Sequence, residues 1–438
     1  MKGQGQGPGT APTDVSSPGA AGRRTAASGR AESDRRAGPE PKVGTGGRRA
    51  AGVVLWPTAV LVLLHAGWVG AVGPAHDLHI LWSGSRRLLS GGPLYDPDLA
   101  FIYPPLAGWA LAPLGVLPFR GAVVVMTLVS LAALVAAVVL VLGLVGVAWR
   151  SPLTAGVLLA AALSRPVQGL LHQGNLDVLL TLAQVVMIRA LVARRDVAAG
   201  ALLGVVCAVK PTLTPLVLGA LLLRRVRVTL VAVGVGAVLT VLGFLLVPDG
   251  RVFLTDVLPM LGDGNRPELH RYDRSLQAAV EELGLPGPVG GVLRVAAFAV
   301  AVGLGWRRRH GPLAPLEVMP LLLLGGLLAS SFSWANYSLY LLPLLVTVVL
   351  PGSLVRAWPA WAGVYALWSA GEWPSPGLGG TFDSVLALRP LWGWLLLLLT
   401  CAWVAVRAGP AMLGLGWSAG RGPRQPPDEG VARERGEG

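Results

Sequence analysis

The sequence predicts an all-α polytopic membrane protein, and three observations support this prediction. The chain of 438 residues is 53% hydrophobic and only 13% charged, whereas about 25% of the residues in a typical soluble domain are charged. Apolar stretches of about 20 residues recur along most of the sequence, and each can cross a bilayer core about 30 Å thick. The basic residues gather in short clusters between these stretches. A water-soluble globular protein is therefore not expected.

The formal net charge of +13 does not indicate a nucleic-acid partner, because the basic residues lie in the tails and between apolar stretches. This distribution is typical of the cytoplasmic loops of membrane proteins. All but three of the 36 basic residues are arginine, and Lys210 is the one lysine inside an apolar region. Cys207 and Cys401 both lie in apolar segments, so neither a disulfide framework nor a zinc site is predicted.

The first and last parts of the chain are predicted to be disordered cytoplasmic tails. Residues 1–50 contain 11 Gly, five Pro and nine Lys or Arg, and such a segment buries too little apolar surface to offset its ordering entropy. No cleavable signal peptide is predicted there. Residues 411–438 have a similar composition, so the multi-spanning domain is placed at residues 51–410. The basic first tail is expected to be attracted to anionic lipids of the cytoplasmic leaflet.

Between the tails, about twelve membrane-spanning helices are predicted. Arginine clusters flank alternate connections between these helices, and an excess of basic residues marks the cytoplasmic side. Twelve passes with both termini in the cytoplasm place every cluster on that side. The predicted spans are 53–72, 121–148, 152–170, 174–192, 197–209, 212–223, 226–247, 289–306, 313–331, 335–351, 357–371 and 389–407.

Two of these segments, 197–209 and 212–223, are short for a membrane span, and Pro211 and Pro215 interrupt them. Two interpretations remain open. The segments are either tilted helices or two half-helices that meet at Lys210. Irregular backbone at membrane depth is tolerated only where it lines a cavity or is buried in protein.

The predicted topology places the first outer loop, residues 73–120, on the extracytoplasmic face. The turn at 164–175, the loop 248–288 and the turn at 331–336 emerge on the same face. Within the first loop, the proline-rich apolar stretch 104–118 is too short for a span and is predicted to form re-entrant or interfacial helices.

Asp77 follows the first span directly, in the sequence His76-Asp77-Leu78-His79. A carboxylate at the edge of the hydrocarbon is costly unless it has a partner or a function. Two interpretations are open at this point: a general base that accepts a proton from a hydroxyl group, or a helix cap at the start of a loop. A metal site formed with His76 and His79 is not favoured, because adjacent helical positions do not share a face and no further cluster completes the ligand set.

The first loop resembles a known family. Its residues, in order, are Asp77, Gly92-x-Leu94-Tyr95-Asp96, Phe101-x-Tyr103-Pro104-Pro105, Pro113-Leu114 and Leu117-Pro118. This pattern resembles the first-loop signature of glycosyltransferase family 87, a family of polytopic GT-C fold enzymes that includes actinobacterial polyprenol-phosphate-mannose-dependent mannosyltransferases. The resemblance implies a GT-C-like bundle, and it implies that Asp77 is catalytic.

Four later segments resemble the family with lower fidelity. They are Gly174-Asn175-Leu176-Asp177, where a Gly-Gln-x-Asn motif is usual; Gly200 and Gly204 before Lys210-Pro211; Asp273-Arg274-Ser275-Leu276, where both amides of an Asn-Gln-Ser-Leu motif are changed; and Ser330-Ser331-Phe332-Ser333-Trp334 through Tyr337 to Leu342-Pro343, where Phe332 replaces a proline. The resemblance extends over about residues 53–407. Abundant Ala, Gly and Arg with few Lys suit a GC-rich, actinobacterial genome.

The donor expected from the resemblance is a polyprenyl-phosphate sugar, whose phosphate leaving group requires cations or hydrogen-bond donors. The alternatives are snorkelling for Lys210, solvation for an arginine in a loop, and interface anchoring for the aromatic residues. No metal or other cofactor is required, because lysine and arginine can stabilise a monophosphate. The predicted donor- or substrate-binding residues are Lys210, His172, Arg165, Arg271, Arg274, Tyr103, Asn175, Asp177, Trp334 and Tyr337.

The sequence thus predicts an inverting glycosyltransferase of a bacterial plasma membrane, with its active site on the extracytoplasmic face. The transferred sugar is predicted to be a hexose, namely mannose, and the acceptor a lipid or glycan; a pentose remains open. The alternative function is a membrane transporter or lipid flippase, which also uses broken helices and an intramembrane lysine. Transporters place polar groups near the bilayer midplane, whereas here they gather on one face. A non-catalytic membrane scaffold, in which Asp77 would be replaceable, is the other alternative.

Overall fold

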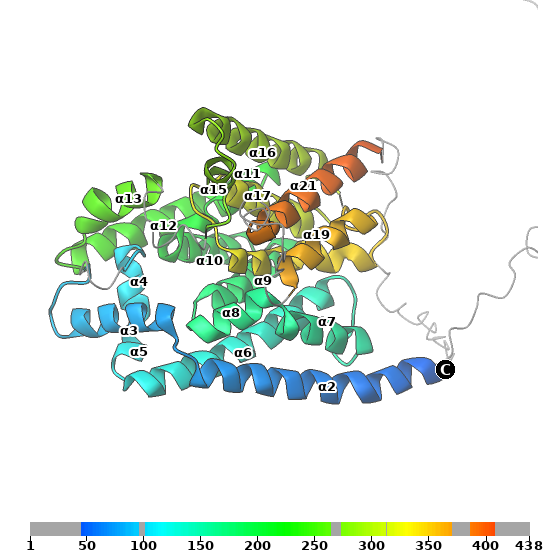
Figure 1. The fold of residues 1–438 in the computed structure, drawn as a ribbon, viewed down its shortest axis with the longest axis horizontal. Coiled ribbons are helices and arrows are strands. Elements are labelled where there is room, and N and C mark those ends of the chain that lie inside the picture. Colours follow the sequence, from blue (N-terminus) through cyan, green and yellow to red (C-terminus); the bar gives the residue numbers. More distant parts are fainter. Residues whose placement is uncertain (1–44, 96–100, 264–272, 312, 370–385, 408–438) are drawn as a thin grey trace, which may run out of the picture. The chain divides into compact units, whose positions relative to one another are not determined.

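The computed structural model describes residues 45–95, 101–263, 273–311, 313–369 and 386–407. Within these ranges every regular element is a helix (Figure 1), which confirms the predicted all-α class. The chain divides into residues 1–50 and 51–438. Most of the first unit, and residues 408–438, lie outside the described ranges, so the disordered tails stay a prediction.

Five helices in the described ranges are long and apolar enough to cross a membrane, or six if one bent pair is counted as a span. In α2 and α12 only 17% of the most apolar window is buried, so most of each helix surface is available to lipid. The five helices are α2 (Thr45–Val72), α6 (Phe119–Leu144), α12 (Val226–Leu246), α16 (Gly287–Arg308) and α21 (Arg389–Arg407). A polytopic membrane protein is therefore confirmed, while the number of twelve spans stays a prediction.

The bent pair is α7 (Pro152–Leu163) and α8 (Arg165–Gln173), which meet at an angle of 59°. The span predicted over 152–170 is bent at Ser164, where the predicted turn 164–175 begins, for a local reason. Ser164 has an extended backbone, and its hydroxyl accepts a 3.4 Å hydrogen bond from the Val167 amide. Pro166 in the first turn of α8 also suits a helix start, since proline lacks the amide hydrogen that an earlier turn would use.

The chain breaks at Lys210 between two short helices, while both interpretations, tilted spans and half-helices, stay predictions. After α9 (Asp177–Val192), α10 (Asp196–Val209) ends at Lys210, whose backbone is extended. A 3₁₀ turn, η2 (Pro211–Leu213), and α11 (Pro215–Leu222) follow. Pro211 cannot donate the hydrogen bond that would continue α10, and it disfavours a helical backbone at Lys210.

Helix α10 packs closely on α12 because two glycines face it. A Cβ atom at Gly200 would lie 2.6 Å from the Val228 carbonyl oxygen, and one at Gly204 would lie 2.7 Å from that of Ala232. Small residues four apart allow two membrane helices to approach at their backbones. The Gly200–Gly204 pair thus fixes α10 at short range from α12 and so determines where its end, Lys210, lies.

The first loop contains the short helices that the sequence predicts. They are α3 (His76–Leu89), α4 (Pro105–Ala110) and α5 (Ala112–Gly115). Helix α3 contacts α4, α5, α6 and α8, and α4 contacts α10 and α12. Figure 1 shows α3, α4 and α5 close together near the start of α6. The short helices of the first loop therefore pack against α6 and α8 on one side and against α10 and α12 on the other.

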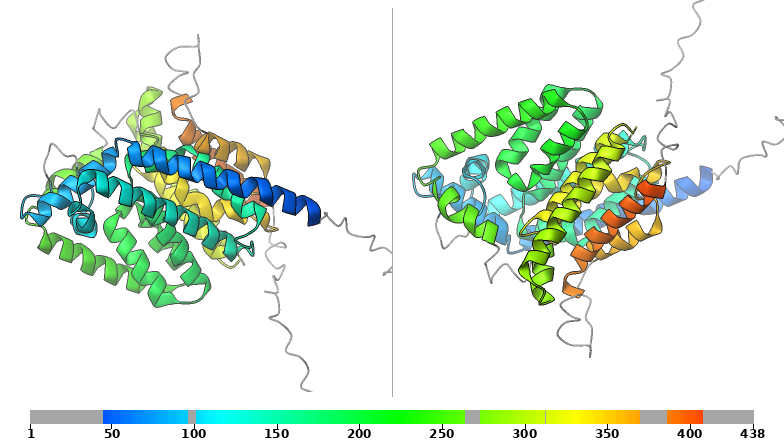
Figure 2. Two further views of the ribbon diagram at one scale, coloured as in Figure 1. Left: turned by 90° about the horizontal axis from the view of Figure 1, so that it is seen from below. Right: turned by 90° about the horizontal axis from the view of Figure 1, so that it is seen from above.

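In the second half, α16 contacts α17 and α19 contacts α21, as the right view of Figure 2 shows. The predicted span 335–351 is a series of short helices instead of one continuous helix. The remaining elements are η3 (Phe253–Val257), α13 (Leu258–Asp263), α15 (Leu276–Glu282), α17 (Ala314–Ala329), η4 (Ala335–Leu341), α18 (Leu342–Leu345), η5 (Val346–Val349) and α19 (Trp358–Trp368).

Candidate active site

The start of α3 has a strained backbone that brings Asp77 close to α8. Ala75 precedes the helix with a φ of 48°, a conformation that is uncommon for a residue with a side chain. Its amide donates a 3.1 Å hydrogen bond to the carbonyl oxygen of His172, near the end of α8. This bond ties the chain just before Asp77 to the α8–α9 turn.

Asp77 lies in the first turn of α3 and is only 8% exposed. Its Oδ2 accepts a 2.6 Å hydrogen bond from Nδ2 of Asn175. Within the described ranges Oδ1 has no hydrogen-bond partner, so one carboxylate oxygen remains available. Burial raises the pKa of Asp77, while the Asn175 hydrogen bond and the charge of Lys210 act to lower it. The helix-cap interpretation is not supported, because no side chain caps α3.

The turn before α9 orients Asn175 toward Asp77. Gly174 has a φ of 66°, and a Cβ atom there would lie 2.7 Å from Cβ of Leu78. Glycine thus allows both the left-handed turn and the close approach of α3. The Asn175 amide side chain bridges two groups, because its Oδ1 also accepts a 2.9 Å hydrogen bond from the backbone amide of Asp177.

Asp177 is fully buried and forms an ion pair with Lys210 through Oδ1. The hydroxyl of Tyr340, on η4, donates a 2.8 Å hydrogen bond to the same oxygen. Oδ2 of Asp177 is buried with no partner among the described residues. Asp177 and Lys210 were predicted from the sequence as site residues, but Tyr340 was not. Its three-residue spacing after Tyr337, in a segment that was expected to be a regular span, is the signal that could have identified it.

Two tyrosine rings lie beside the Lys210 ammonium group. Its Nζ lies 4.4 Å from the ring centroid of Tyr337 and 5.9 Å from that of Tyr103. Both distances are within the range of a cation–π interaction. Tyr103 comes from the first loop and Tyr337 from η4, so the predicted residues Tyr103, Lys210 and Tyr337 do come together.

Tyr95 and Tyr103 of the first loop are held by Asp249, which was not predicted from the sequence as a site residue. The carboxylate of Asp249 accepts hydrogen bonds from the amides of Leu94 (2.9 Å) and Tyr95 (2.6 Å). The Tyr95 hydroxyl donates a 2.8 Å bond to the carbonyl oxygen of Tyr103. The Leu94-Tyr95 motif therefore has a positioning role, which places Tyr103 against Lys210.

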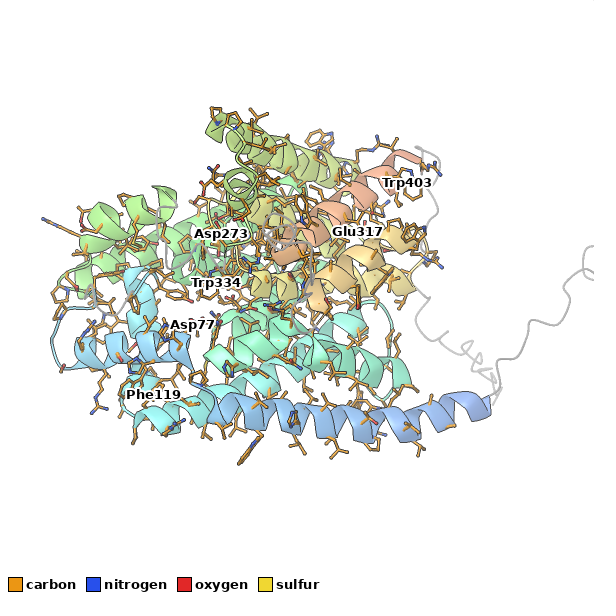
Figure 3. All side chains as sticks on the ribbon, in the orientation of Figure 1. Asp77, Phe119, Asp273, Glu317, Trp334 and Trp403 are labelled. Atoms are coloured by element: carbon orange, nitrogen blue, oxygen red, sulfur yellow. The ribbon has the colours of Figure 1, made fainter. Side chains whose placement is uncertain are left out.

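Trp334 precedes η4, three residues before Tyr337 and six before Tyr340. Its backbone is extended, so it lies outside the 3₁₀ turn that carries the two tyrosines. Its ring contacts that of Phe332, with the centroids 5.8 Å apart. The indole Nε1 of Trp334 is buried with no hydrogen-bond partner in the described part of the chain. Figure 3 labels Trp334 together with Asp77 and Asp273.

Arg274 lies beside Trp334, because its amide donates a 2.7 Å hydrogen bond to the carbonyl oxygen of Ser333. The buried Asp273 carboxylate accepts bonds from the amides of Ser275 (2.9 Å) and Ser333 (3.0 Å). Burial raises the pKa of Asp273, whereas these hydrogen bonds lower it. Asp273 therefore joins two loops and positions its neighbours.

The other predicted residues form no hydrogen bond or ion pair with Asp77 in the described part of the chain. Arg165 begins α8 and is half-buried, while His172 lies near the end of α8 with an exposed side chain. Seven helical steps separate them by about 10 Å. Arg271 lies outside the described ranges. Within those ranges no group of three or more His, Cys, Asp or Glu side chains is arranged to hold a metal ion.

Comparison with known proteins identifies related membrane enzymes. The profile of glycosyltransferase family 87 matches residues 101–333. An alpha-(1->3)-arabinofuranosyltransferase of Mycobacterium tuberculosis is 30% identical over 79% of this chain and 82% of its own length. The corresponding enzyme of Mycolicibacterium smegmatis is 28% identical over 80% of this chain and 84% of its own length.

A second kind of relative is also similar. A polyprenol-phosphate-mannose-dependent alpha-(1-2)-phosphatidylinositol pentamannoside mannosyltransferase of M. tuberculosis is 30% identical over 64% of this chain and 69% of its own length. No solved structure matches the chain. The fold and the relatives together define a multi-pass membrane glycosyltransferase. The chain belongs to glycosyltransferase family 87.

Proposed function

We propose that the chain is an inverting glycosyltransferase in which Asp77 is the general base. The observation that carries this proposal is the geometry of Asp77, whose Oδ2 is held by Asn175 while Oδ1 has no described partner. The donor is a polyprenyl-phosphate sugar, and the acceptor is a hydroxyl group of a lipid or glycan. The family membership of the chain supports glycosyl transfer over the transporter alternative.

The reaction proceeds as a single displacement. Oδ1 of Asp77 accepts the proton of the acceptor hydroxyl while the acceptor oxygen attacks the anomeric carbon. The bond between that carbon and the phosphate oxygen breaks, and the phosphate leaves with the electron pair. Attack in line with the departing phosphate inverts the configuration at the anomeric carbon. Correct orientation of the two substrates supplies a large part of the rate enhancement.

The phosphate binds to basic residues of α8 and of the segment before α15 in this proposal. Arg165 and Arg274 are both half-buried, so their charges are less screened than those of exposed arginines. His172 and Arg271 are the other proposed phosphate ligands. The indole N–H of Trp334, which is buried without a described partner, is proposed to donate to the sugar or phosphate.

The reaction takes place on the extracytoplasmic side of the bacterial plasma membrane in this proposal. Asp77 follows the end of α2 at Val72, whereas Arg48 and Arg49 precede the span that begins at Ala50. The positive-inside rule places the arginine end in the cytoplasm. The opposite end of α2, and with it Asp77, then faces outward, where lipid-linked sugars are used.

For the transferred sugar we propose a pentofuranose, arabinofuranose, in place of the hexose that the sequence predicts. The arabinofuranosyltransferases of M. tuberculosis and M. smegmatis match 79% and 80% of the chain, whereas two M. tuberculosis mannosyltransferases match 64% and 71%. Mannose is the second candidate, and the mannosyltransferase relative supports it. A panel of polyprenyl-phosphate arabinose and polyprenyl-phosphate mannose donors, tested with the same purified protein and acceptors, distinguishes the two by which donor is consumed.

The central experiment is sugar transfer by the full-length protein in lipid vesicles. We expect wild-type protein to transfer label from a radiolabelled polyprenyl-phosphate sugar, and Asp77→Asn to reduce the rate by on the order of 100- to 10,000-fold. Asp196→Asn is the matched control, because Asp196 forms a half-buried pair with Arg225 (3.5 Å) away from the site. Full activity of Asp77→Asn would exclude Asp77 as the base. Consumption of no polyprenyl-phosphate sugar would contradict the enzyme proposal.

A further inference from the structure

Lys210 forms an ion pair with Asp177. Its ammonium group is enclosed by protein, whereas a group that binds a donor phosphate needs an open side. It is 5% exposed, and its Nζ is paired with Asp177. The rings of Tyr103 and Tyr337 lie beside the ammonium group. A donor phosphate that bound Nζ would have to compete with Asp177 and displace a tyrosine ring.

Asp177 connects Lys210 to the base through the start of α9. Asp177 is the first residue of that helix, and its backbone amide donates to Oδ1 of Asn175. The same Asn175 side chain donates to Asp77 through Nδ2. A shift of Asp177 would therefore move the group that orients Asp77.

Three segments far apart in the sequence meet at Oδ1 of Asp177. The carboxylate belongs to α9, Lys210 to the break after α10, and Tyr340 to η4. A buried carboxylate that loses its cationic partner is strongly destabilised, and so is a buried ammonium group that loses its carboxylate. Removing both charges avoids either penalty. The pair therefore acts as a unit.

From this geometry we infer that Lys210 is a positioning residue, the buried counterion that fixes Asp177 and through Asn175 the base Asp77, and not a ligand of the donor phosphate. This inference rests on the proposed function, since it assigns a role within the same site. It changes the role that the sequence predicts for Lys210. It also gives Asp177 and Tyr340 a shared purpose, which is to hold the start of α9.

The test is a double-mutant cycle in the vesicle assay with Lys210→Met, Asp177→Asn and the double variant. Each single variant is expected to lower kcat at least tenfold, while the KM for the donor changes less than threefold. The double variant is expected to recover at least fivefold in kcat over Lys210→Met. A double variant no better than Lys210→Met, with donor KM raised tenfold or more in both, would overturn the inference and assign Lys210 to the phosphate.

The pH profile of kcat provides a readout that loss of packing would not produce. The charged groups that act on Asp77 are Lys210, Asp177 and His76. Lys210 lowers the pKa of Asp77, so Lys210→Met should move the acidic limb of the profile to higher pH. Asp177 raises that pKa, so Asp177→Asn should move the limb to lower pH, and the double variant should return near the wild-type position. If the acidic limb of the kcat profile stayed at the wild-type pH in both single variants, the inference would be contradicted.

Thermal unfolding of the same proteins tests the pair without any substrate. Both single variants should unfold at lower temperature than wild type, and the double variant should regain part of the loss. If wild-type protein transferred no sugar, the proposed function would fail while this cycle still tested the pair. No recovery of thermal stability in the double variant would overturn the inference on its own.

If Lys210→Met does not accumulate in cells, Asp177→Asn alone provides the test. An unchanged kcat of Asp177→Asn would contradict the inference, and a tenfold loss would support it.

Discussion

Two buried carboxylates in this protein show how similar chemistry serves different purposes. Glu317, on α17, accepts hydrogen bonds at both oxygens, from Nε of Arg308 (2.7 Å) and from the amide of Leu354 (3.2 Å). Arg308 also donates to the carbonyl oxygen of Gly352 (2.9 Å). Asp77, by contrast, is held at one oxygen only. Figure 3 shows that Asp77 and Glu317 lie well apart.

The difference indicates which carboxylate is structural and which is reactive. Every polar atom of a buried structural group tends to be hydrogen-bonded, since an unpaired one is costly. Glu317 fulfils this condition, and it joins the ends of α16 and α17 to the loop after η5. Asp77, which is 8% exposed, keeps one oxygen without a described partner, whereas the unpartnered oxygen of Asp177 belongs to a fully buried side chain. A group that accepts a proton during the reaction needs such an oxygen.

The largest change in stability is expected at the ion pair of Arg308 and Glu317, in which both carboxylate oxygens are hydrogen-bonded. Arg308→Met leaves Glu317 buried without its cation, so we expect the free energy of unfolding to fall by about 3–5 kcal/mol. Transfer activity per folded molecule should be unchanged, because Glu317 lies apart from Asp77. Heating in detergent followed by size-exclusion chromatography measures the first effect, and the vesicle assay the second. Reduced activity of the folded fraction would weaken the distinction between the two regions.

The next largest effect is expected at Gly174. Its φ of 66° resembles that of Gly284 (63°), but only Gly174 would place a Cβ atom against another side chain. Both Gly→Ala variants should lose about 1–2 kcal/mol through the left-handed backbone, and Gly174→Ala about 1–3 kcal/mol more through its clash with Leu78. Only Gly174→Ala should also lower transfer, because Leu78 follows Asp77. Equal losses of stability and activity in both variants would contradict the proposed close approach.

A smaller effect is expected from Asn175→Ala, which removes the one described hydrogen bond to Asp77. We expect a loss in kcat of about tenfold, which corresponds to about 1.4 kcal/mol. That hydrogen bond lowers the pKa of Asp77. Its loss should raise the pKa and move the acidic limb of the pH–rate profile to higher pH. Gln168→Ala, an exposed change on α8, is the control, and a limb that stays in place would show that Asn175 does not act on Asp77.

The smallest effect is expected at the half-buried pair of Asp196 and Arg225. Exposed pairs of this kind contribute about 0–1 kcal/mol. Asp196→Asn should therefore change neither the unfolding temperature nor the transfer rate measurably. A large loss of stability in this variant would mean that the burial of an ion pair does not determine how much it contributes to the free energy of unfolding.

Much of the candidate site was predictable from the sequence, since Asp77, Asn175, Asp177, Lys210, Tyr103 and Tyr337 are brought together as a group. Their residue types were informative because charged groups beside apolar segments are costly without a purpose. Tyr340 and Asp249 were missed. Each forms a hydrogen bond with a residue more than 150 positions away in the sequence. The pattern of residue types within a short segment does not show which distant residue it contacts.

The sequence by itself determined the all-α membrane class, the break at Lys210 and the short helices of the first loop. These features depend on hydropathy, proline and glycine, which act within a few residues. Only the tertiary structure decided that Lys210 is paired with Asp177 and that Asn175 holds Asp77. Those contacts arise where α3, α9, the end of α10 and η4 pack together, so they depend on how distant segments fill the same interior.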